Sequence, residues 1–462
     1  MAAAKATSGI AIRTVSFSYF ATGILRPSYP ANAAAFAPSF TTLIARVRKH
    51  RYRAKSQGVW CFAVPINFCI RHQGLVMAGR RKESSARSSR KSETTRRHFL
   101  QAAGAAAATA SVTPLILHAS DKAGTKNPVL GEGAYQYEVI SHDWGEVPSH
   151  IQWGETHGVA VDEAGLVYVT HRSHAPEPLD AVVVFDPQGK FVRSFGKEYH
   201  TGGHGIDIRK EGNEEFLYLC STRTSLVTKT TLKGEIVWKK ERLLETGKYD
   251  DPKTPYSPTN IAFAPDGGFY IGDGYGSHWI HQFDKEAKWV RTFGGAGTAP
   301  GQFQTPHGQW LDNRPGREPS LIVADRANFR LQYLTLEGKH LGFVTQDNEG
   351  NPGLTSDVAA LKSPVSFPAH FDIRGDVLLV PDLHARVTLF DKNNKVLTHL
   401  GYDPDWTKQV LGDGKFPVRS DRSLWKTGKF IHPHDACFDR SGNLFVVEWV
   451  IGGRVNFLRH VS

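Results

Sequence analysis

Histidines recur at the start of six similar segments of the chain, and this recurrence is the clearest chemical signal in the sequence. Five segments open with histidine and the third opens with asparagine; in chain order these residues are His157, His204, Asn260, His307, His370 and His434. Neutral imidazole is a good ligand for zinc and for other divalent metals. Three converging imidazoles leave one coordination position open, as in a catalytic zinc site. A single histidine at the start of one segment would more often hold a turn by hydrogen bonding. Five histidines at the same position of successive segments favour a bound metal.

The segments themselves have the pattern of small antiparallel sheets. In the typical segment a short apolar strand turns through Gly, Asp or Asn into a second β-rich strand and then a third. In two segments a polar hairpin turn, at residues 186–190 and 391–394, leads on to a fourth strand. The segments start 47, 56, 47, 63 and 64 residues apart, which suits four-stranded blades with loop insertions. No stretch has a sustained 3.6-residue apolar period, so we predict an all-β, six-bladed β-propeller rather than a helical solenoid.

The two ends of this repeat array are expected to meet. The sixth segment stops at residues 455–461, one strand short, whereas residues 135–140 precede the first segment and have strand composition. We predict that this N-terminal strand completes the last blade, because closing the ring removes an exposed sheet edge. The first strand of each blade lines the central channel. Segments two, four and six lie about 120° apart around a six-bladed ring, which selects three predicted metal ligands: His204, His307 and His434.

Charge divides the chain into two parts. Residues 1–118 hold 18 Lys and Arg against two acidic residues, and the remainder holds 38 against 43. The net charge of +11 therefore comes from the N-terminal part, and the remainder is slightly acidic, which excludes a basic nucleic-acid footprint on the propeller. Beyond residue 118 the only cysteines are Cys220 and Cys437. They fall in non-adjacent segments, so we expect neither a disulfide scaffold nor a disulfide between them.

The N-terminal part has the features of a targeting sequence. Arg96 and Arg97 directly precede an uncharged Ala-rich run, which resembles a twin-arginine export signal. We therefore expect a basic extension over residues 1–93, a signal over 94–119 and a propeller over 130–462. Because such signals start near the N-terminus, translation is expected to begin at Met77. The expected product is a monomer that the twin-arginine machinery exports to the periplasm or beyond, with no membrane span after processing.

Several segments of the propeller resemble the peptidyl-α-hydroxyglycine α-amidating lyases, which are NHL-repeat propellers. These segments are residues 269–275, 300–307, 324–332 and 433–435, and the looser resemblance extends over about residues 155–460. The resemblance implies three channel histidines for zinc, a tyrosine and an arginine at the substrate, and calcium deeper in the channel. Residue by residue it points to His204, His307 and His434 as zinc ligands, Tyr275 and Arg172 as catalytic, and Asp435 as the calcium ligand. His157, Asn260 and His370 are the other expected channel residues.

The reaction implied by the resemblance is cleavage of an N-acyl-α-hydroxyglycine, a small carboxylate or peptide C-terminus, to an amide and glyoxylate. Zinc would lower the pKa of the substrate hydroxyl, Tyr275 would take its proton, and Arg172 would pair with the carboxylate. Structural roles stay open for each residue: Tyr275 as a packing aromatic, Arg172 in a surface salt bridge, and Asp435 as a turn acceptor.

Two other functions also stay open. One is a non-catalytic NHL propeller that binds a peptide, glycan or envelope protein. The other is a calcium-dependent sugar-lactone hydrolase, which Asn260 fits but the histidine-rich channel argues against. Four further histidines fall on loops after second strands, where we expect them to be solvated: His171, His174, His278 and His281.

Overall fold

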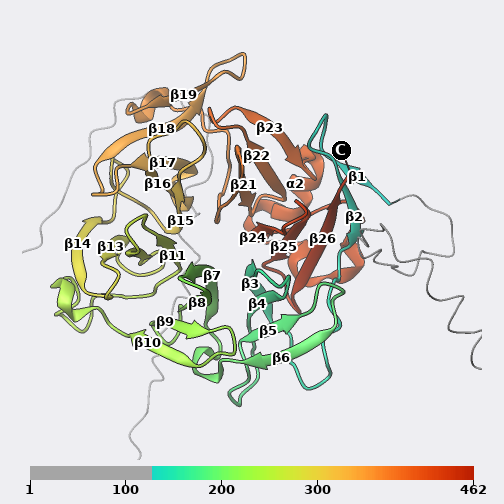
Figure 1. Cartoon of the computed structure of the whole chain (residues 1–462). Helices are drawn as coiled ribbons and strands as arrows, with labels where there is room; N and C mark the ends of the chain where they lie inside the picture. The colour runs from blue at the N-terminus through green and yellow to red at the C-terminus, as the bar shows by residue number, and fades with distance from the viewer. Residues whose placement is uncertain (1–126, 462) are drawn as a thin grey trace, which may run out of the picture. The chain divides into compact units, whose positions relative to one another are not determined.

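The computed structural model describes residues 127–461, and these residues form six antiparallel sheets arranged as blades around a central channel (Figure 1). The architecture is the predicted six-bladed β-propeller. The predicted basic extension and twin-arginine signal lie outside the described residues.

The strands of the first three blades run outward from the channel in chain order. Blade one holds β3 (Glu155–Val161), β4 (Val167–Arg172), β5 (Val182–Phe185) and β6 (Phe191–Phe195). Blade two holds β7 (Gly203–Glu211), β8 (Glu214–Ser221), β9 (Leu226–Thr231) and β10 (Ile236–Lys240). Blade three holds β11 (Asn260–Phe263), β12 (Phe269–Gly272), β13 (Trp279–Phe283) and β14 (Trp289–Gly294).

Blades four and five follow the same order, blade six takes its two outer strands from before blade one, and blades four and six have a fifth strand. Blade four holds β15 (Pro306–Asp312), β16 (Ser320–Asp325), β17 (Arg330–Leu334), β18 (His340–Gln346) and β19 (Pro352–Thr355). Blade five holds β20 (Asp372–Arg374), β21 (Val377–Asp382), β22 (Arg386–Phe390) and β23 (Val396–Leu400). Blade six holds β24 (Pro433–Phe438), β25 (Leu444–Glu448), β26 (Arg454–His460), β2 (Tyr137–Ser141) and β1 (Val129–Leu130).

The ring closes through blade six, as the sequence predicted. β2 pairs antiparallel with β26, with Tyr137 opposite His460 and Val139 opposite Leu458. A strand from before blade one thus completes the sheet that ends the chain (Figure 1). The strand predicted at residues 135–140 is observed at Tyr137–Ser141, so it begins two residues later and ends one residue later.

Apolar side chains on both faces of the strands hold neighbouring blades together. Between blades six and one, for example, Trp144, Val169, Phe185, Phe445 and Phe457 form one buried cluster. Full burial of a side chain of this size contributes about 1.5–3 kcal/mol. Both faces of each blade are covered, so the strands are continuous apolar runs such as Val182–Phe185 instead of strictly alternating ones. Cys220 and Cys437 are buried and free, as expected.

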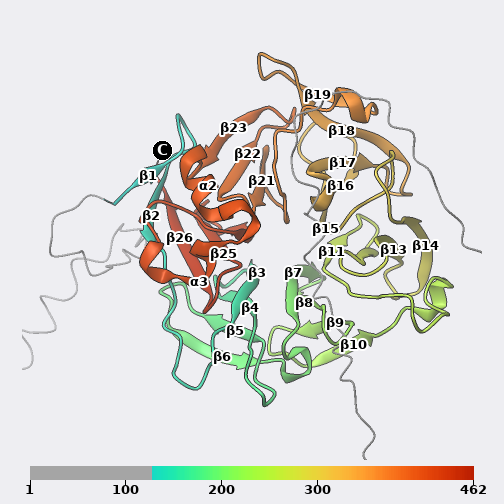
Figure 2. The ribbon, with the colours of Figure 1, turned by 180° about the vertical axis from the view of Figure 1, so that it is seen from behind.

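A helical insertion between blades five and six is the main feature that the sequence analysis did not predict. It contains α2 (Pro404–Leu411) and α3 (Pro417–Ser420) (Figure 2). Asp403 caps α2 by accepting hydrogen bonds from two backbone N–H groups. Trp406 and Val418 pack with Ile431 and with other residues of blades five and six. No helix within residues 127–461 is long and apolar enough to cross a membrane.

Short 3-10 turns lie between these strands and helices. They are η1 (Lys197–Tyr199), η2 (Leu244–Thr246), η3 (Arg326–Asn328), η4 (Val358–Ala360), η5 (Gly412–Gly414) and η6 (Arg422–Leu424).

Candidate metal centre

Four buried imidazoles meet in the channel. The ring centroids of His204, His307 and His434 lie 4.6–4.8 Å apart. His157 joins them, with its ring 4.6 Å from that of His434 and 5.1 Å from that of His204. The structure therefore brings the three predicted ligands together, and adds a histidine that the sequence analysis had placed only in the channel.

Bulges at the start of the inner strands aim these side chains into the channel. The strand register shifts between Gly203 and Ile206 in β7, and between Pro306 and Gln309 in β15, so each histidine lies on the extra residue of a bulge. Bulges commonly re-aim a side chain in this way. The following glycine permits a close approach of the next inner strand: a Cβ on Gly205 would lie 2.4 Å from the Thr259 carbonyl oxygen.

Hydrogen bonds fix the tautomer of all four imidazoles. In each ring Nδ1 lies 2.7–2.9 Å from a backbone carbonyl oxygen, which can only accept, so Nδ1 carries the hydrogen. Nε2 is therefore the nitrogen with the free lone pair. Burial holds the pKa of each of these rings well below its ordinary value, which keeps the imidazoles neutral. Neutral imidazoles oriented by backbone carbonyls are the usual state of histidine metal ligands.

The donor set fits a divalent metal. One ring nitrogen from each of His157, His204 and His434 lies within 4.8 Å of the others, so these three could hold a metal ion. The Nε2 atom of His204 is buried and has no hydrogen-bond partner, which is costly unless a ligand engages it. In His307 the same atom accepts a hydrogen bond from the Tyr275 hydroxyl at 3.0 Å.

Tyr275 lies at the edge of this centre. It follows β12, and its ring centroid lies 5.3 Å from that of His204 and 5.4 Å from that of His307. The side chain is 37% exposed, so it borders both the imidazoles and the open mouth of the channel. Its hydroxyl group contacts an imidazole, which is more than a packing aromatic needs.

Arg326 is a site residue that the sequence analysis missed. Its guanidinium lies over the Tyr275 ring at 5.1 Å and over the Phe367 ring at 5.2 Å. The residue is only 6% exposed, and its Nε–H has no hydrogen-bond partner. Arg326 belongs to the segment 324–332 that resembles the lyases, but the direction of its side chain depends on a turn that the pattern does not reveal.

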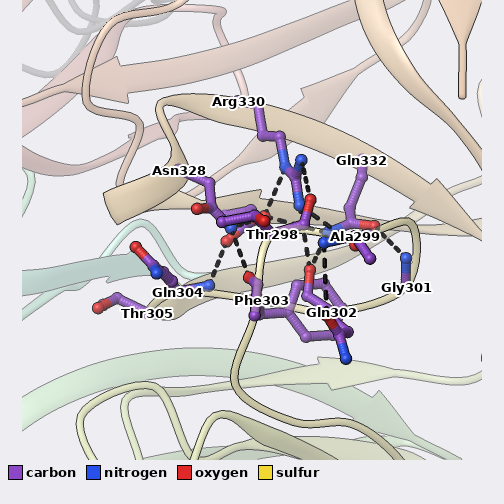
Figure 3. A network of polar contacts seen from close by, with 12 residues as sticks. Thr298, Ala299, Gly301, Gln302, Phe303, Gln304, Thr305, Asn328, Arg330 and Gln332 are labelled. Carbon is purple, nitrogen blue, oxygen red and sulfur yellow. Dashed lines mark hydrogen bonds and ion pairs between the residues drawn. The ribbon is translucent and has the colours of Figure 1, made fainter. Parts of the chain in front are cut away.

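A polar network holds the turn that carries Arg326 (Figure 3). Asp325, the residue before it, accepts hydrogen bonds from Arg330 Nε at 2.7 Å and from the Gln304 backbone N–H at 2.7 Å. The Arg326 N–H then donates to the Thr305 carbonyl at 3.0 Å. The end of β16 is thereby fixed to the segment that leads into β15 and its histidine.

Arg172 ends β4 on the same face of the ring. Its Nη2 donates to the Thr222 hydroxyl at 2.7 Å, and its Nε–H is buried without a hydrogen-bond partner. Among residues 127–461 no carboxylate forms an ion pair with Arg172, so the surface salt bridge considered above is not found. After burial, the positive charge of Arg172 also lowers the pKa of His157 and of His204.

Acidic side chains line a second cavity of the channel, which is formed in part by Asp207, Asp372 and Asp435 and is called here the second level. Asp435 Oδ2 accepts the Val159 N–H at 3.0 Å and Oδ1 accepts the Ala436 N–H at 2.8 Å. Burial raises the pKa of Asp435 to about 7. Asp207 and Asp372, which the sequence analysis did not single out, line the same cavity of about 200 Å³.

The remaining predicted channel residues meet at this level. Asp207 Oδ2 is buried without a hydrogen-bond partner and lies 3.6 Å from His370 Nε2. Asn260 Nδ2 lies 2.9 Å from the His370 ring. His370 precedes β20 and does not form part of it, although the sequence analysis had placed this residue at the start of that strand.

The expectation that four loop histidines are solvated is wrong for two of them. His171 and His281 are fully buried. The ring of His171 lies between the Gly154 N–H and the Asp180 carbonyl, and His281 Nε2 bonds the Tyr249 hydroxyl at 2.7 Å. Both are structural residues within blades, whereas His174 is exposed as expected. His278 is half-buried, and its Nδ1 accepts a hydrogen bond from the Thr305 N–H at 2.9 Å.

Comparison with known proteins gives a weak sequence match. No protein-family model matches the chain. Over 219 residues it is 26% identical to peptidyl-glycine alpha-amidating monooxygenase B of Xenopus laevis, covering 41% of this chain and 24% of that protein. Monooxygenase A of the same organism is also 26% identical, over 41% of this chain and 22% of that protein. The match therefore spans about a quarter of the length of these relatives.

Solved structures give matches of propeller type at low identity. A streptogramin B lyase structure has a TM-score of 0.44 and 12% identity, and covers 71% of this chain and 99% of that chain. Virginiamycin B lyase from Staphylococcus aureus has a TM-score of 0.43 and 13% identity, with 70% and 100% covered. This chain is thus a six-bladed β-propeller with weak sequence similarity to peptidyl-glycine alpha-amidating monooxygenase.

Proposed function

We propose that the channel of this propeller is the active site of a metal-dependent carbon–nitrogen lyase. The substrate class is an N-acyl-α-hydroxyglycine, and the products are an amide and glyoxylate. The observation that carries the proposal is the group of four buried, neutral imidazoles with a tyrosine hydroxyl at its edge. Similarity to a peptidyl-glycine alpha-amidating monooxygenase supports the choice of substrate class.

His204 and His434 belong both to the ligand set predicted from the sequence and to the set whose ring nitrogens lie within 4.8 Å of one another. We propose these two as ligands, with His307 or His157 as the third. Zinc is the proposed ion because three neutral imidazoles and an open position suit it. Such a metal, when bound, supplies Lewis acidity that favours ionisation of the substrate hydroxyl.

We propose that Tyr275 carries a proton. Because His307 Nδ1 already donates to a carbonyl, the Tyr275 hydroxyl donates its hydrogen to Nε2 and keeps lone pairs free toward the mouth. In the proposed step, with His157 as the third ligand, the Tyr275 proton passes to His307 Nε2 as the Tyr275 oxygen takes the substrate hydroxyl proton. The C–N bond breaks as the carbonyl of glyoxylate forms, and a proton returns through Tyr275 to the leaving amide nitrogen. Atoms and charge balance without any further reactant.

We propose that Arg172 and Arg326 bind the substrate carboxylate. Each has a buried Nε–H with no hydrogen-bond partner among the described residues, and neither forms an ion pair there. Guanidinium groups bind carboxylates with two parallel hydrogen bonds, which also fixes the orientation of the α-carbon. The ring of Tyr275 holds Arg326 in place from one side.

Glyoxylate release tests this proposal. The full chain, loaded with zinc, is mixed with N-benzoyl-α-hydroxyglycine, and glyoxylate and benzamide are quantified with and without a chelator. Equal amounts of the two products, lost on chelation and restored by zinc, support a metal-dependent lyase. Absence of turnover at full metal occupancy refutes it.

We also propose a calcium ion at the second level of the channel. Calcium prefers oxygen ligands, and Asp435 and Asp207 offer carboxylates to one buried cavity in which Asp207 Oδ2 has no hydrogen-bond partner. Isothermal titration of calcium into the chelated protein, compared with an Asp207→Asn variant, tests this site.

For the N-terminal part we propose twin-arginine export to the periplasm. The proposal rests on Arg96 and Arg97 and the Ala-rich run that follows them. Replacing both arginines with lysine should retain the protein in the cytoplasm of an expressing bacterium, whereas unchanged export would rule out this route.

A further inference from the structure

A third arginine, Arg223, lies near Arg172, and the proposed reaction does not use it. Arg223 is exposed and directly follows Thr222, whose hydroxyl accepts the hydrogen bond from Arg172. A Cβ built on Gly202, two residues before His204, would lie 2.9 Å from the Arg223 Cβ, so Arg223 lies beside the start of the inner strand that carries this histidine. Among residues 127–461, Arg223 forms no ion pair.

A chain of hydrogen bonds joins these groups across neighbouring blades. The Thr222 carbonyl accepts from the Ser257 hydroxyl at 2.9 Å, and the Ser257 carbonyl accepts from the Tyr275 N–H at 3.2 Å. Arg326 of blade four then lies over the Tyr275 ring. These contacts connect blades one to four along one edge, which carries Arg172, Arg223, Tyr275 and Arg326 and is called here the rim.

Within residues 127–461, none of the three guanidiniums of this rim forms an ion pair with a carboxylate. The buried Glu155 is already engaged by Arg419 at 2.5 Å and by His174 at 2.6 Å. Arg172 and Arg326 each keep an unpartnered Nε–H. A rim of one sign attracts and selects ligands of the other sign.

A substrate with a single carboxylate would neutralise only part of the positive charge of the three arginines. In the proposed reaction the α-carboxylate is bound by Arg172 and Arg326, so Arg223 is left to face the part of the substrate that lies further out. We propose that the substrate is a dianion, an N-acyl-α-hydroxyglycine whose acyl part carries a second carboxylate that Arg223 binds. This inference rests on the proposed lyase function for the reacting end of the molecule.

A pair of unreactive analogues tests the second anionic contact. Binding of N-benzoylglycine and of N-(4-carboxybenzoyl)glycine to the zinc-loaded full chain is measured by isothermal titration calorimetry at about 20 mM salt, where charge screening is weak. We expect the dianion to bind about fivefold to tenfold more tightly, and this advantage to shrink as salt is added.

Variants assign the effect to Arg223. Arg223→Gln should remove most of the dianion's advantage and leave the affinity for N-benzoylglycine within about twofold. Arg291→Gln, on the outer strand β14, removes one charge elsewhere and should preserve the advantage. Equal affinity for the two analogues, failure of the dianion to bind, or an advantage that survives Arg223→Gln would overturn the inference.

Turnover of the two corresponding α-hydroxyglycines separates this inference from the lyase proposal. Turnover of both without a dianion preference refutes the second carboxylate and keeps the lyase. An Arg223-dependent preference in binding, with no turnover of either compound, supports the anion site and refutes the lyase.

Discussion

Replacing Tyr275 with phenylalanine removes one hydroxyl and leaves the aromatic ring. The lost contact is the hydrogen bond to His307 Nε2 at 3.0 Å. One such bond is worth about 1 kcal/mol of stability, which for a domain of this size lowers Tm by less than about 4 °C. The ring contact with Arg326 at 5.1 Å is retained, so the rim and the metal centre should keep their geometry.

Turnover should respond far more strongly than stability. If Tyr275 carries the proton, the variant loses a general acid–base group, and kcat should fall by about 10²- to 10⁴-fold. Metal content should stay unchanged, because the ring nitrogens of His157, His204 and His434 do not depend on the hydroxyl. Initial rates of glyoxylate release at saturating substrate measure the effect.

Tyr270→Phe is the matched control. Its hydroxyl donates to the Leu336 carbonyl at 2.8 Å between blades three and four, away from the imidazoles. It should lose a similar amount of stability and retain kcat. A Tyr275→Phe protein that keeps kcat within about threefold of the parent would remove this residue from the proposed chemistry.

Three further predictions concern the metal, the substrate and pH. His204→Ala should abolish stoichiometric zinc binding in metal analysis, while comparison of His157→Ala with His307→Ala identifies the third ligand; retained full occupancy in His204→Ala contradicts the proposed centre. Arg172→Gln should lower kcat/KM for glyoxylate release by about 10²-fold, and an unchanged value would exclude carboxylate binding by this residue. Burial raises the pKa of Asp372 to about 7, so the folded state keeps its proton above pH ~4, where the unfolded chain releases it. Its contribution to stability is therefore present at low pH and is lost as pH rises through about 7. Urea unfolding in the presence of chelator, at acidic and at alkaline pH, should show a smaller decrease in unfolding free energy with pH for Asp372→Asn than for the parent. An equal decrease in the two proteins would contradict this assignment.

The fold could be predicted because its determinants are local and repeated. Turn residues such as Gly165, at φ 86°, recur at similar offsets in most segments and divide short apolar runs into strands. The shortfall of one strand in the last segment matched the extra strand near Tyr137, which identified the closure of the ring.

The helical insertion could not be recognised in the same way. α2 has eight residues and α3 has four, too few for a distinct 3.6-residue pattern. Its position is determined by long-range contacts, such as the bond from Trp406 Nε1 to the Phe430 carbonyl and the ion pair between Arg419 and Glu155.

The site was predictable to the extent that it depends on register. The repeat placed His204, His307 and His434 at equivalent positions, and the structure brings them together. His157 holds the equivalent position in blade one, which the choice of alternate blades left out, and its ring lies beside those of His204 and His434. The direction of the Arg326 side chain depends on the turn after β16. Such backbone details are not visible in residue types and spacing alone.

A metal titration that follows turnover tests the central claim most directly. Zinc is added stepwise to the chelated, dialysed full chain while glyoxylate release from N-benzoyl-α-hydroxyglycine is recorded in the same sample. We predict that the rate rises linearly and levels off at about one zinc per chain, as one centre built around His204 and His434 requires. A rate that is independent of zinc, or saturation of the site without turnover, would contradict a metal-dependent lyase.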